Sequence, residues 1–493
     1  MSSRTEESSQ NARGGAEPPA RPTTDSADGG RSGRSWQDVR ALLLRLHFYA
    51  GIFVAPFLLV AALTGLVYTF APQLDQLVYG DQLRVERVAG EPRPLSEQIA
   101  AARAAHPEGT LDSVISPPGP EDTTQVVLSV PELGENQRTV YVDPYTAEVK
   151  GELTTSWGST PLTTWLSELH SSLQLGDAGR LYSEVAATWL WVLVAGGLVL
   201  WLGRVRGQRA KGARGALLPD RGARGVRRTR SWHAATGVWL ALGLLFLSAT
   251  GLTWSQYAGD RFGQLLDTVK GKAPRLDTAL PGAEPAAEGD HAGHGEHAGH
   301  GAAGNETASA DPADFDTALA VARDAGLGGT VQVKPPADSA SAWAVAQKDN
   351  VWPVRFDSVA IDVDRRVVTA ESRWADYPVL AKLTKLGIQA HMGRLFGIVN
   401  QIALAAIALG LTLVVVWGYR MWWQRRPIRD DRRAVLGKAP ARGAWRRLPL
   451  PVLVLGVPAV VALGWALPLL GVTLLGFLVV DVVVGFVGRA RTA

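Results

Sequence analysis

Long apolar runs alternate with long polar segments along this chain, and the alternation predicts most of its architecture. Apolar runs of about 18 or more residues are typical of membrane-spanning helices. Six runs of this kind cover residues 41–70, 185–203, 233–257, 395–418, 449–468 and 471–488. The pattern therefore predicts a polytopic α-helical membrane protein with about six spans, which has the lipid bilayer as its first partner.

Arginine and lysine concentrate in two of the polar segments between the spans. Segments 204–230 and 420–447 each hold ten Arg or Lys. Short basic loops stay in the cytoplasm, so both loops are assigned to that side, together with segment 1–38, which is expected to be a disordered tail. Segments 72–184 and 258–394 then lie outside, and six spans return the C-terminus to the cytoplasm. The basic residues flank the spans instead of covering a folded surface, so nucleic-acid binding is not expected.

Each outside segment carries the pattern of a small α+β domain. In the first, a helical pattern at 95–107 precedes strand-like stretches, and the domain is expected over about 95–155. In the second, a helical pattern at 313–326 has the same position, and the domain is expected over about 313–375. Residues 273–312, rich in Ala, Gly, Pro and His, are expected to form a mobile linker before the second domain.

Four histidines stand beside the apolar runs, at two levels of the membrane. His47 and His233 open their runs at the cytoplasmic side, and His170 and His391 precede theirs at the outer side. Neutral imidazole is the commonest metal ligand in proteins. The four histidines are therefore candidate ligands, in two pairs, for a metal or a haem.

The chain also contains a repeat. Residues 47–66 align with 233–252 without gaps at an offset of 186, which matches His47 with His233 and Thr64-Gly65-Leu66 with Thr250-Gly251-Leu252. Small residues at these positions permit close approach of helices. In the second half of each unit, GRLYSEVAA (179–187) resembles GRLFGIVNQ (393–401). A unit of helix, outside domain, histidine and helix is thus expected twice, in the same direction.

Two motifs resemble a known family. YVDPYTAEVKGEL (141–153) looks like the terminal hairpin of a PepSY domain, and residues 391–427 are similar to the signature of the PepSY-associated transmembrane proteins. The resemblance covers about residues 36–427 and leaves the last two spans as an appended hairpin. It implies two extracytoplasmic PepSY-like domains and a bacterial plasma (inner) membrane location. Because some members are haem-containing reductases of ferric siderophores, it also implies a role in iron acquisition.

The same resemblance places the four histidines at the family's recurrent histidine positions. His47 with His233, and His170 with His391, would then each hold one b-type haem, so one or two haems are expected, with Arg180 and Arg394 pairing with the propionates. The alternatives are histidines that lie beside lipid headgroups or bond an outside domain. Two departures stand out: His170 is nine residues before Gly179 but His391 only two before Gly393, and Asp364-Arg365-Arg366 replaces the usual turn of the second domain.

Three further features bear on the chemistry. The chain has no cysteine, which excludes iron–sulfur clusters and covalent c-type haem. A His-rich stretch in the linker is a candidate transition-metal site, with incidental metal binding as the alternative; its members are His291, His294, His297 and His300. Asp481 lies inside the sixth run. It is a functional candidate unless a neighbouring helix satisfies it or it lies near the inner rim.

The expected function is haem-dependent transmembrane electron transfer, with reduction of a ferric chelate or siderophore outside. A quinol or another membrane carrier would supply the electrons. Two rivals remain open: a non-enzymatic metal-homeostasis or sensor protein, and a PepSY-based regulator of an extracytoplasmic peptidase. One difficulty concerns distance, because His391 to Trp417 is 26 residues, or about 39 Å of helix, which is long for direct electron transfer between two haems.

Overall fold

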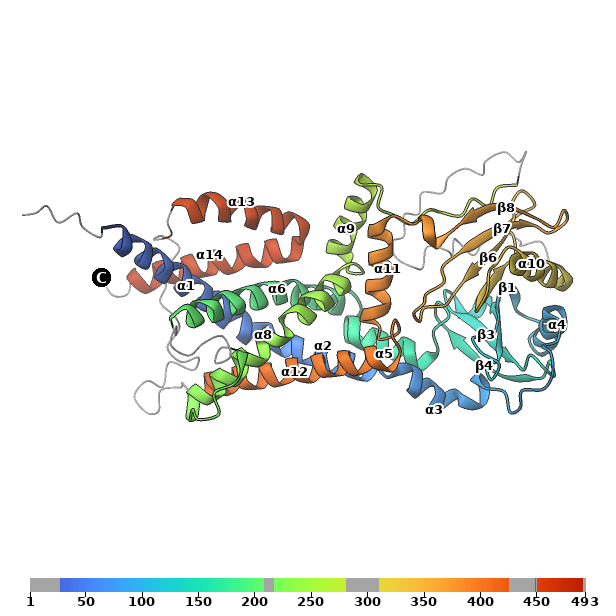
Figure 1. Ribbon diagram of the computed structural model, residues 1–493, viewed down its shortest axis with the longest axis horizontal. Coiled ribbons are helices and arrows are strands. Elements are labelled where there is room, and N and C mark those ends of the chain that lie inside the picture. The colour runs from blue at the N-terminus through green and yellow to red at the C-terminus, as the bar shows by residue number, and fades with distance from the viewer. Residues whose placement is uncertain (1–26, 208–216, 281–309, 425–447, 449, 491–493) are drawn as a thin grey trace, which may run out of the picture.

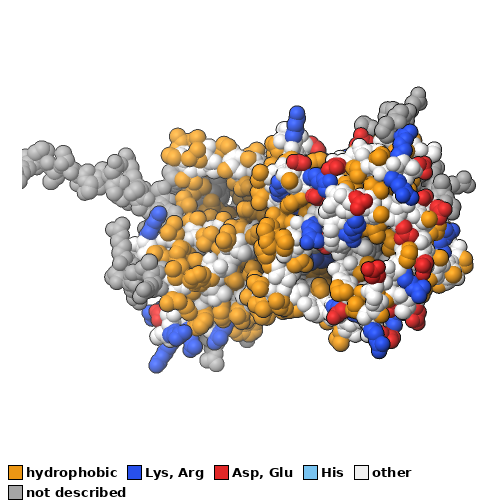
Figure 2. Space-filling model, turned by 45° about the vertical axis from the view of Figure 1, so that its right-hand side comes forward, with side chains coloured by type: hydrophobic (Ala, Val, Ile, Leu, Met, Phe, Trp, Pro, Cys, Tyr) orange, Lys and Arg blue, Asp and Glu red, His pale blue; other side chains and the backbone are white. Residues whose placement is uncertain are grey.

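The computed structural model describes residues 27–207, 217–280, 310–424, 448 and 450–490. A bundle of long helices occupies one end of the molecule and a broad β-sheet with two helices occupies the other (Figure 1). Apolar side chains cover the bundle, and charged side chains gather over the sheet end (Figure 2). This division agrees with a multi-pass membrane protein that carries a polar domain at one side.

The bundle is built from one bent helix pair and three long helices. Contacts between neighbours form a ring, because α2 touches α6 and α12, α1 touches α6, and α8 touches both α6 and α12. The α1/α2 pair and α8 are therefore diagonal across the bundle. Their bounds are α1 Ala27–Phe53, α2 Ala55–Tyr68, α6 Gly176–Gly207, α8 Gly225–Leu252 and α12 Ile398–Gln424.

The first apolar run is not one straight helix. Helix α1 begins at Ala27, inside the tail that was expected to be disordered as far as residue 38. The chain then bends by 56° between the apolar part of α1, which ends at Phe53, and α2. Pro56 lies in the first turn of α2, where it removes a backbone donor and clashes with the preceding turn, so the bend follows from the sequence.

Six spans were expected, and the described residues support fewer. Four helices are long and apolar enough to cross a membrane, or five if α1 and α2 count as one broken span. The remaining apolar helix, α13 (Leu450–Ala466), has 17 residues and forms a hairpin with α14 (Pro468–Ala490). The hairpin lies beside the bundle (Figure 1).

The two segments that were expected outside the membrane contain similar lobes, each with one α-helix and four strands. The sequence predicted a helix followed by strands in each lobe, but the first strand of the first lobe was not recognised. The elements of the first lobe are α4 Leu95–Ala105, β1 Thr110–Ile115, β2 Thr124–Ser129, a short 3-10 helix Pro131–Leu133, β3 Gln137–Val142 and β4 Val149–Thr155. Those of the second are α10 Pro312–Asp324, β5 Val331–Lys334, β6 Trp343–Gln347, β7 Ser358–Asp362, β8 Val367–Ser372 and a 3-10 helix Trp374–Asp376.

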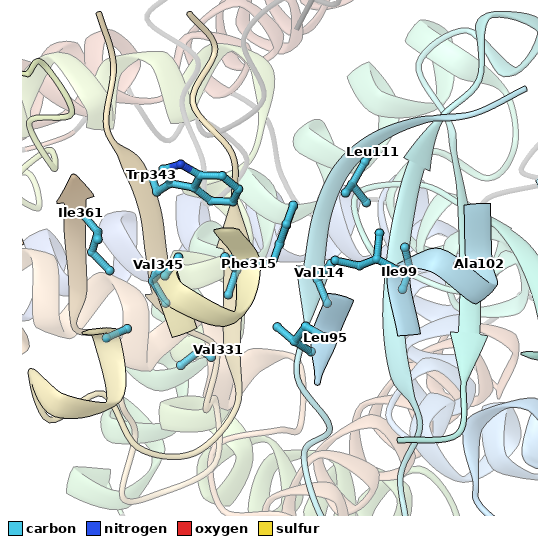
Figure 3. Packing of buried hydrophobic residues seen from close by; sticks show 14 of the residues in the cluster. Leu95, Ile99, Ala102, Leu111, Val114, Phe315, Val331, Trp343, Val345 and Ile361 are labelled. Carbon is cyan, nitrogen blue, oxygen red and sulfur yellow. The ribbon is translucent and has the colours of Figure 1, made fainter. Parts of the chain in front are cut away.

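The lobes are not separate domains, because their strands form a single eight-stranded antiparallel sheet. The order is β4-β3-β2-β1-β5-β6-β7-β8, with β1 and β5 paired at the centre through Val114↔Val333 and Ile115↔Gln332. One apolar core joins both halves: Ile99 and Val114 lie opposite Phe315 and Val345 (Figure 3). The sheet therefore ties the first repeat unit to the second.

Four further helices connect the sheet to the bundle, and none of them was predicted as a separate element. In the first unit α3 (Ala71–Leu83) precedes the lobe and α5 (Pro161–Ser172) follows it; in the second, α9 (Gln256–Thr268) precedes it and α11 (Val379–His391) follows it. Helices α9 and α11 run across the bundle direction, at the level where the bundle meets the sheet (Figure 1). The chain thus repeats the order of span, connecting helix, lobe, connecting helix and span.

Candidate functional site

The first histidine pair lies between diagonal helices at the end of the bundle far from the sheet. His47 is on α1 and His233 is on α8, and the centroids of their rings are 6.3 Å apart with the ring planes almost perpendicular. The sequence placed these two residues together from their equivalence in the repeat. The structure brings them into contact across the bundle.

The second pair lies at the sheet end. His170 and His391 have ring centroids 6.5 Å apart. They were expected at the rims of the long apolar helices, but they stand near the ends of the connecting helices α5 and α11. Helix α5 packs on α2 and α6, and α11 packs on α8. These contacts hold the two rings at the end of the bundle that faces the sheet.

The two ring separations suit one metal ion between each pair. A metal held by one nitrogen from each ring at about 2.0–2.1 Å separates the centroids by roughly 6.3–6.5 Å when the rings lie on opposite sides of the metal, since a centroid is about 1.1–1.2 Å behind its nitrogen. The observed values are 6.3 and 6.5 Å. In each pair, the two imidazoles are therefore at a separation at which they would hold one iron between them.

Hydrogen bonds around the rings leave the Nε2 atoms available as ligands. Thr64 Oγ1 is 3.1 Å from His170 Nδ1, and Thr250 Oγ1 is 2.8 Å from His391 Nδ1. Each threonine hydroxyl also donates to the backbone carbonyl four residues earlier, at 2.8 Å. A hydroxyl that donates its proton there accepts from the imidazole Nδ1–H, which leaves Nε2 without a proton. This arrangement is typical of histidines that bind metals.

In the far pair, the hydrogen-bond partner of His233 is a backbone carbonyl. His233 Nδ1 is 2.9 Å from the carbonyl oxygen of Val414, so Nδ1 donates and Nε2 is again the free ligand atom. The backbone of Leu193 lies beside His47 in the corresponding place. Within the described residues, however, His47 Nδ1 has no hydrogen-bond partner of normal geometry.

Glycines on the neighbouring helices make room for the rings. A Cβ atom built at Gly65 would lie 2.9 Å from Cε1 of His170, and one at Gly251 would lie 3.3 Å from Cε1 of His391. At the other level, a Cβ atom built at Gly197 would lie 3.3 Å from Cε1 of His47, and one at Gly418 would lie 3.8 Å from Cε1 of His233. Each histidine thus packs against a glycine of another helix.

The structure corrects the sequence alignment of the second half of the repeat. His170 and His391 are 221 residues apart, and the same offset relates Gly197 to Gly418 and Leu193 to Val414. It also relates Gly176 to Gly397, which both have positive φ, 57° and 55°, just where α6 and α12 begin. The similarity of the segments beginning at Gly179 and Gly393, which implied an offset of 214, therefore relates positions that are not structurally equivalent.

The two pairs are closer than the sequence suggested. Thr250, which bonds His391, and His233 lie on the same helix α8, separated by 17 residues. At 1.5 Å per residue this is about 25 Å along the helix axis, against the 39 Å expected from residues 391–417. The difference arises because His391 belongs to α11 and lies beside α8, and not on an extension of α12.

Arg180 and Arg394, which were expected to pair with haem propionates, differ in position. Arg394 follows His391 directly after α11, is partly buried and lines a pocket near the sheet-end pair. Arg180 lies on α6 and is exposed. Arg394 therefore has the better placement for binding an anionic group beside the His170–His391 pair.

A pocket of about 440 Å³ lies next to that pair, between α3, the first lobe and the loop after α11. Tyr68, at the end of α2, lines the pocket and stacks on His170 with the ring centroids 6.5 Å apart. Asp75 accepts hydrogen bonds from the hydroxyls of Thr160 and Thr163, both at 2.7 Å. Burial, reinforced by Asp75, raises the pKa of Tyr141 in the pocket wall, so its phenol stays protonated.

Two acidic residues of the long helices have partners within the fold. Glu184 on α6 is buried and accepts hydrogen bonds from the backbone N–H groups of Tyr257 and Ala258, so it caps the start of α9. Asp481 is paired with Arg45. The His-rich stretch, His291, His294, His297 and His300, lies outside the described residues. Within the described residues, no cluster of three or more His, Cys, Asp or Glu side chains could hold a metal ion.

The sequence held signals for two site residues that were not recognised. Thr64 and Thr250 were matched in the repeat, but they were interpreted only as part of a close helix contact and not as hydrogen-bond partners of the histidines. The contact of Tyr68 with His170 joins α2 to α5, which are far apart in the sequence, so no local pattern indicates it.

Comparison with known proteins bears on the family alone. The chain has no match among the curated proteins. The PepSY-associated TM region matches residues 44–425, which is most of the chain and includes all four paired histidines but neither helix of the C-terminal hairpin. The predicted relationship is thereby confirmed, and the protein belongs to the family of the PepSY-associated TM region.

Proposed function

We propose that this protein carries electrons across the bacterial plasma membrane through b-type haem held by the two histidine pairs, and reduces a ferric chelate outside. The observation that carries the proposal is the pair of ring separations, 6.3 and 6.5 Å, each of which suits an iron between two imidazoles. Haem, when bound, supplies one-electron redox chemistry whose potential depends on its ligands and its burial.

The chain's own residues support this use of the site. The threonine hydroxyls and the Val414 carbonyl fix the protonation of three rings and orient them. If two imidazoles held the iron of each haem, the haem would supply electron-transfer chemistry in preference to the binding of oxygen. The spacing of about 25 Å along α8 then separates two electron-transfer sites at different depths of the bundle.

The direction of transfer follows from the expected topology. The described helix ends beside the basic segments 204–230 and 420–447 are the end of α6, the start of α8 and the end of α12, and they lie at the end of the bundle opposite the sheet (Figure 1). Short basic loops favour the cytoplasm. His47 and His233 would then receive electrons near the inner side, with a quinol as the candidate donor. His170 and His391 would deliver them at the outer side, and both termini would be cytoplasmic.

The pocket beside Tyr68 is the candidate site for the electron acceptor. It opens between the sheet lobe and the sheet-end pair, and one aromatic ring separates it from His170. Its wall combines Arg394 and Arg84 with Asp75 and several hydroxyl and amide groups. Such a lining suits a polar chelate that is held by hydrogen bonds, and a siderophore is a chelate of this kind.

Filling this pocket should slow reduction without disturbing haem. Gln76 lines the pocket from α3, whereas its neighbour Leu77 is 81% exposed and does not line it. We expect Gln76→Trp to weaken chelate binding roughly tenfold, equivalent to about 1.4 kcal/mol, because the indole occupies the acceptor's space. The measurement is reoxidation of the dithionite-reduced protein by a ferric siderophore, with iron(II) trapped by a chromogenic chelator.

Leu77→Trp is the matched control, since it places the same side chain on the same helix but outside the pocket. Equal rates for the two variants would contradict the assignment of the pocket. Iron(II) formation at the wild-type rate by a protein that lacks haem would contradict the electron-transfer function itself. In that case the metal-sensor or peptidase-regulator function would have to be considered.

A further inference from the structure

The C-terminal hairpin is not a loose addition to the bundle. Helix α14 packs on α6 and α9, and α13 also reaches α9. Leu470 is 4% exposed, within the apolar core that α1, α6 and α8 share, and Thr473 accepts a hydrogen bond from the indole of Trp189 at 2.8 Å. The hairpin therefore docks on the side of the bundle that carries His47.

An ion pair joins this hairpin to α1. The guanidinium of Arg45 donates to the carboxylate of Asp481, and their side chains are only 5% and 12% exposed. Around the pair, Arg45 lies over the ring of Tyr49 at 5.2 Å, and Tyr49 packs on Phe477 of α14 at 5.7 Å. Charges within apolar membrane helices are costly unless they are paired, and they mark functional positions by default.

The pair breaks the repeat symmetry next to a proposed ligand. Arg45 is two residues before His47, and the offset of 186 assigns Ser231 to the same position before His233. Ser231 accepts a hydrogen bond from the backbone N–H of Asp220, so that position has a neutral role in the second unit. Two residues before the histidine, the first unit therefore has a buried cation whose anion the hairpin supplies, whereas the second unit has a neutral residue there and its nearest arginine, Arg230, is exposed.

We propose that the α13–α14 hairpin is a docked modulator of the His47–His233 site, and that Asp481 is its positioning residue. Asp481 holds α14 against α1 and balances the charge of Arg45, which precedes His47 by two residues, about 3 Å along the axis of α1, and leaves the helix on roughly the opposite side. The docking role stands on contacts alone, whereas the modulation of a haem rests on the proposed function. Without Asp481, the remaining cation would favour the reduced, more electron-rich state of the neighbouring haem and raise its midpoint potential.

Docking can be measured without haem because the chain has no cysteine of its own. Tyr49→Cys with Phe477→Cys places two thiols between α1 and α14, and oxidative cross-linking in membranes reports their contact. We expect Asp481→Asn to lower the cross-linked fraction several-fold, because Arg45 loses its counter-charge. The swapped pair, Arg45→Asp with Asp481→Arg, should restore it. Val480→Asn is the control: it adds the same amide one residue away, at a position 61% exposed.

The redox measurement uses the full chain with its own residues at 49 and 477. Asp481→Asn should raise the midpoint potential of one haem and leave the other unchanged, with Val480→Asn without effect on either. Unchanged cross-linking in Asp481→Asn would overturn the docking role. Reduced cross-linking with both potentials unchanged would overturn the modulation. A wild-type protein without haem would overturn the proposed function and the modulation with it, while the cross-linking would still decide the docking.

Discussion

Replacing His233 with alanine is expected to lower the haem content of the purified protein from two per chain to one. The change removes one axial ligand from the far pair and leaves His170 and His391, about 25 Å away along α8, in place. Because the remaining haem lies at the sheet end, it should still be oxidised by a ferric chelate after chemical reduction. Haem per chain and the reoxidation rate are the two measurements.

The repeat supplies the internal control. His47→Ala should give the same one-haem protein as His233→Ala, and the double variant should lose nothing more, since both residues serve one site. His391→Ala should instead keep the far haem and lose rapid reoxidation by the chelate. Two haems in His233→Ala, or additive losses in the double variant, would disprove the pairing.

Adding a single methyl group at Gly65 is expected to weaken haem binding at the sheet-end pair. The new Cβ would lie 2.9 Å from Cε1 of His170, a distance that forces the ring to move from its ligating position. Overpacking of this kind costs about 1–3 kcal/mol, so Gly65→Ala should lower haem affinity roughly 5- to 150-fold. Haem titration into the apoprotein, with the other pair removed by His233→Ala, measures this effect.

The same helices offer matched controls and a graded series. A Cβ at Gly51 or Gly237 meets no atom within 4 Å, whereas one at Gly251 lies 3.3 Å from His391. Gly51→Ala and Gly237→Ala should therefore leave the affinity unchanged, and Gly251→Ala should have an effect smaller than that of Gly65→Ala. If all four variants behaved alike, the histidines would not depend on the glycines for their positions.

Much of the site could be predicted from the sequence because the chain repeats itself. The offset of 186 identified His47 and His233 as equivalent, and equivalence in a parallel repeat places two residues symmetrically about one axis. The structure brings the two rings within contact distance. The membrane helices could also be predicted, because the apolar runs are long and charged residues bound each run.

The second half of the repeat was misread for a physical reason. Residues shared by the segments beginning at Gly179 and Gly393 were aligned by identity, but the structural markers are Gly176 and Gly397, whose positive φ values start α6 and α12. An alignment by residue identity does not report the backbone conformation of a turn. For the same reason the short helices α5 and α11, which carry His170 and His391, were not separated from the spans.

The joining of the two lobes could not be predicted from local patterns either. Each lobe has an edge strand, β1 or β5, whose alternating residues fit either solvent or another strand. The pairing of Val114 with Val333 joins strands more than 200 residues apart in sequence. Only the complete fold brings them together.

Whether the two histidine pairs bind haem can be tested with a reduced-minus-oxidised absorption spectrum of the full chain. The protein is expressed with ample haem and purified in detergent, and haem is quantified per chain. We expect the sharp bands of six-coordinate b-type haem, at two haems per chain. One haem per chain would leave one histidine pair without its assigned role. A protein without haem would contradict the proposal that either pair binds iron for electron transfer.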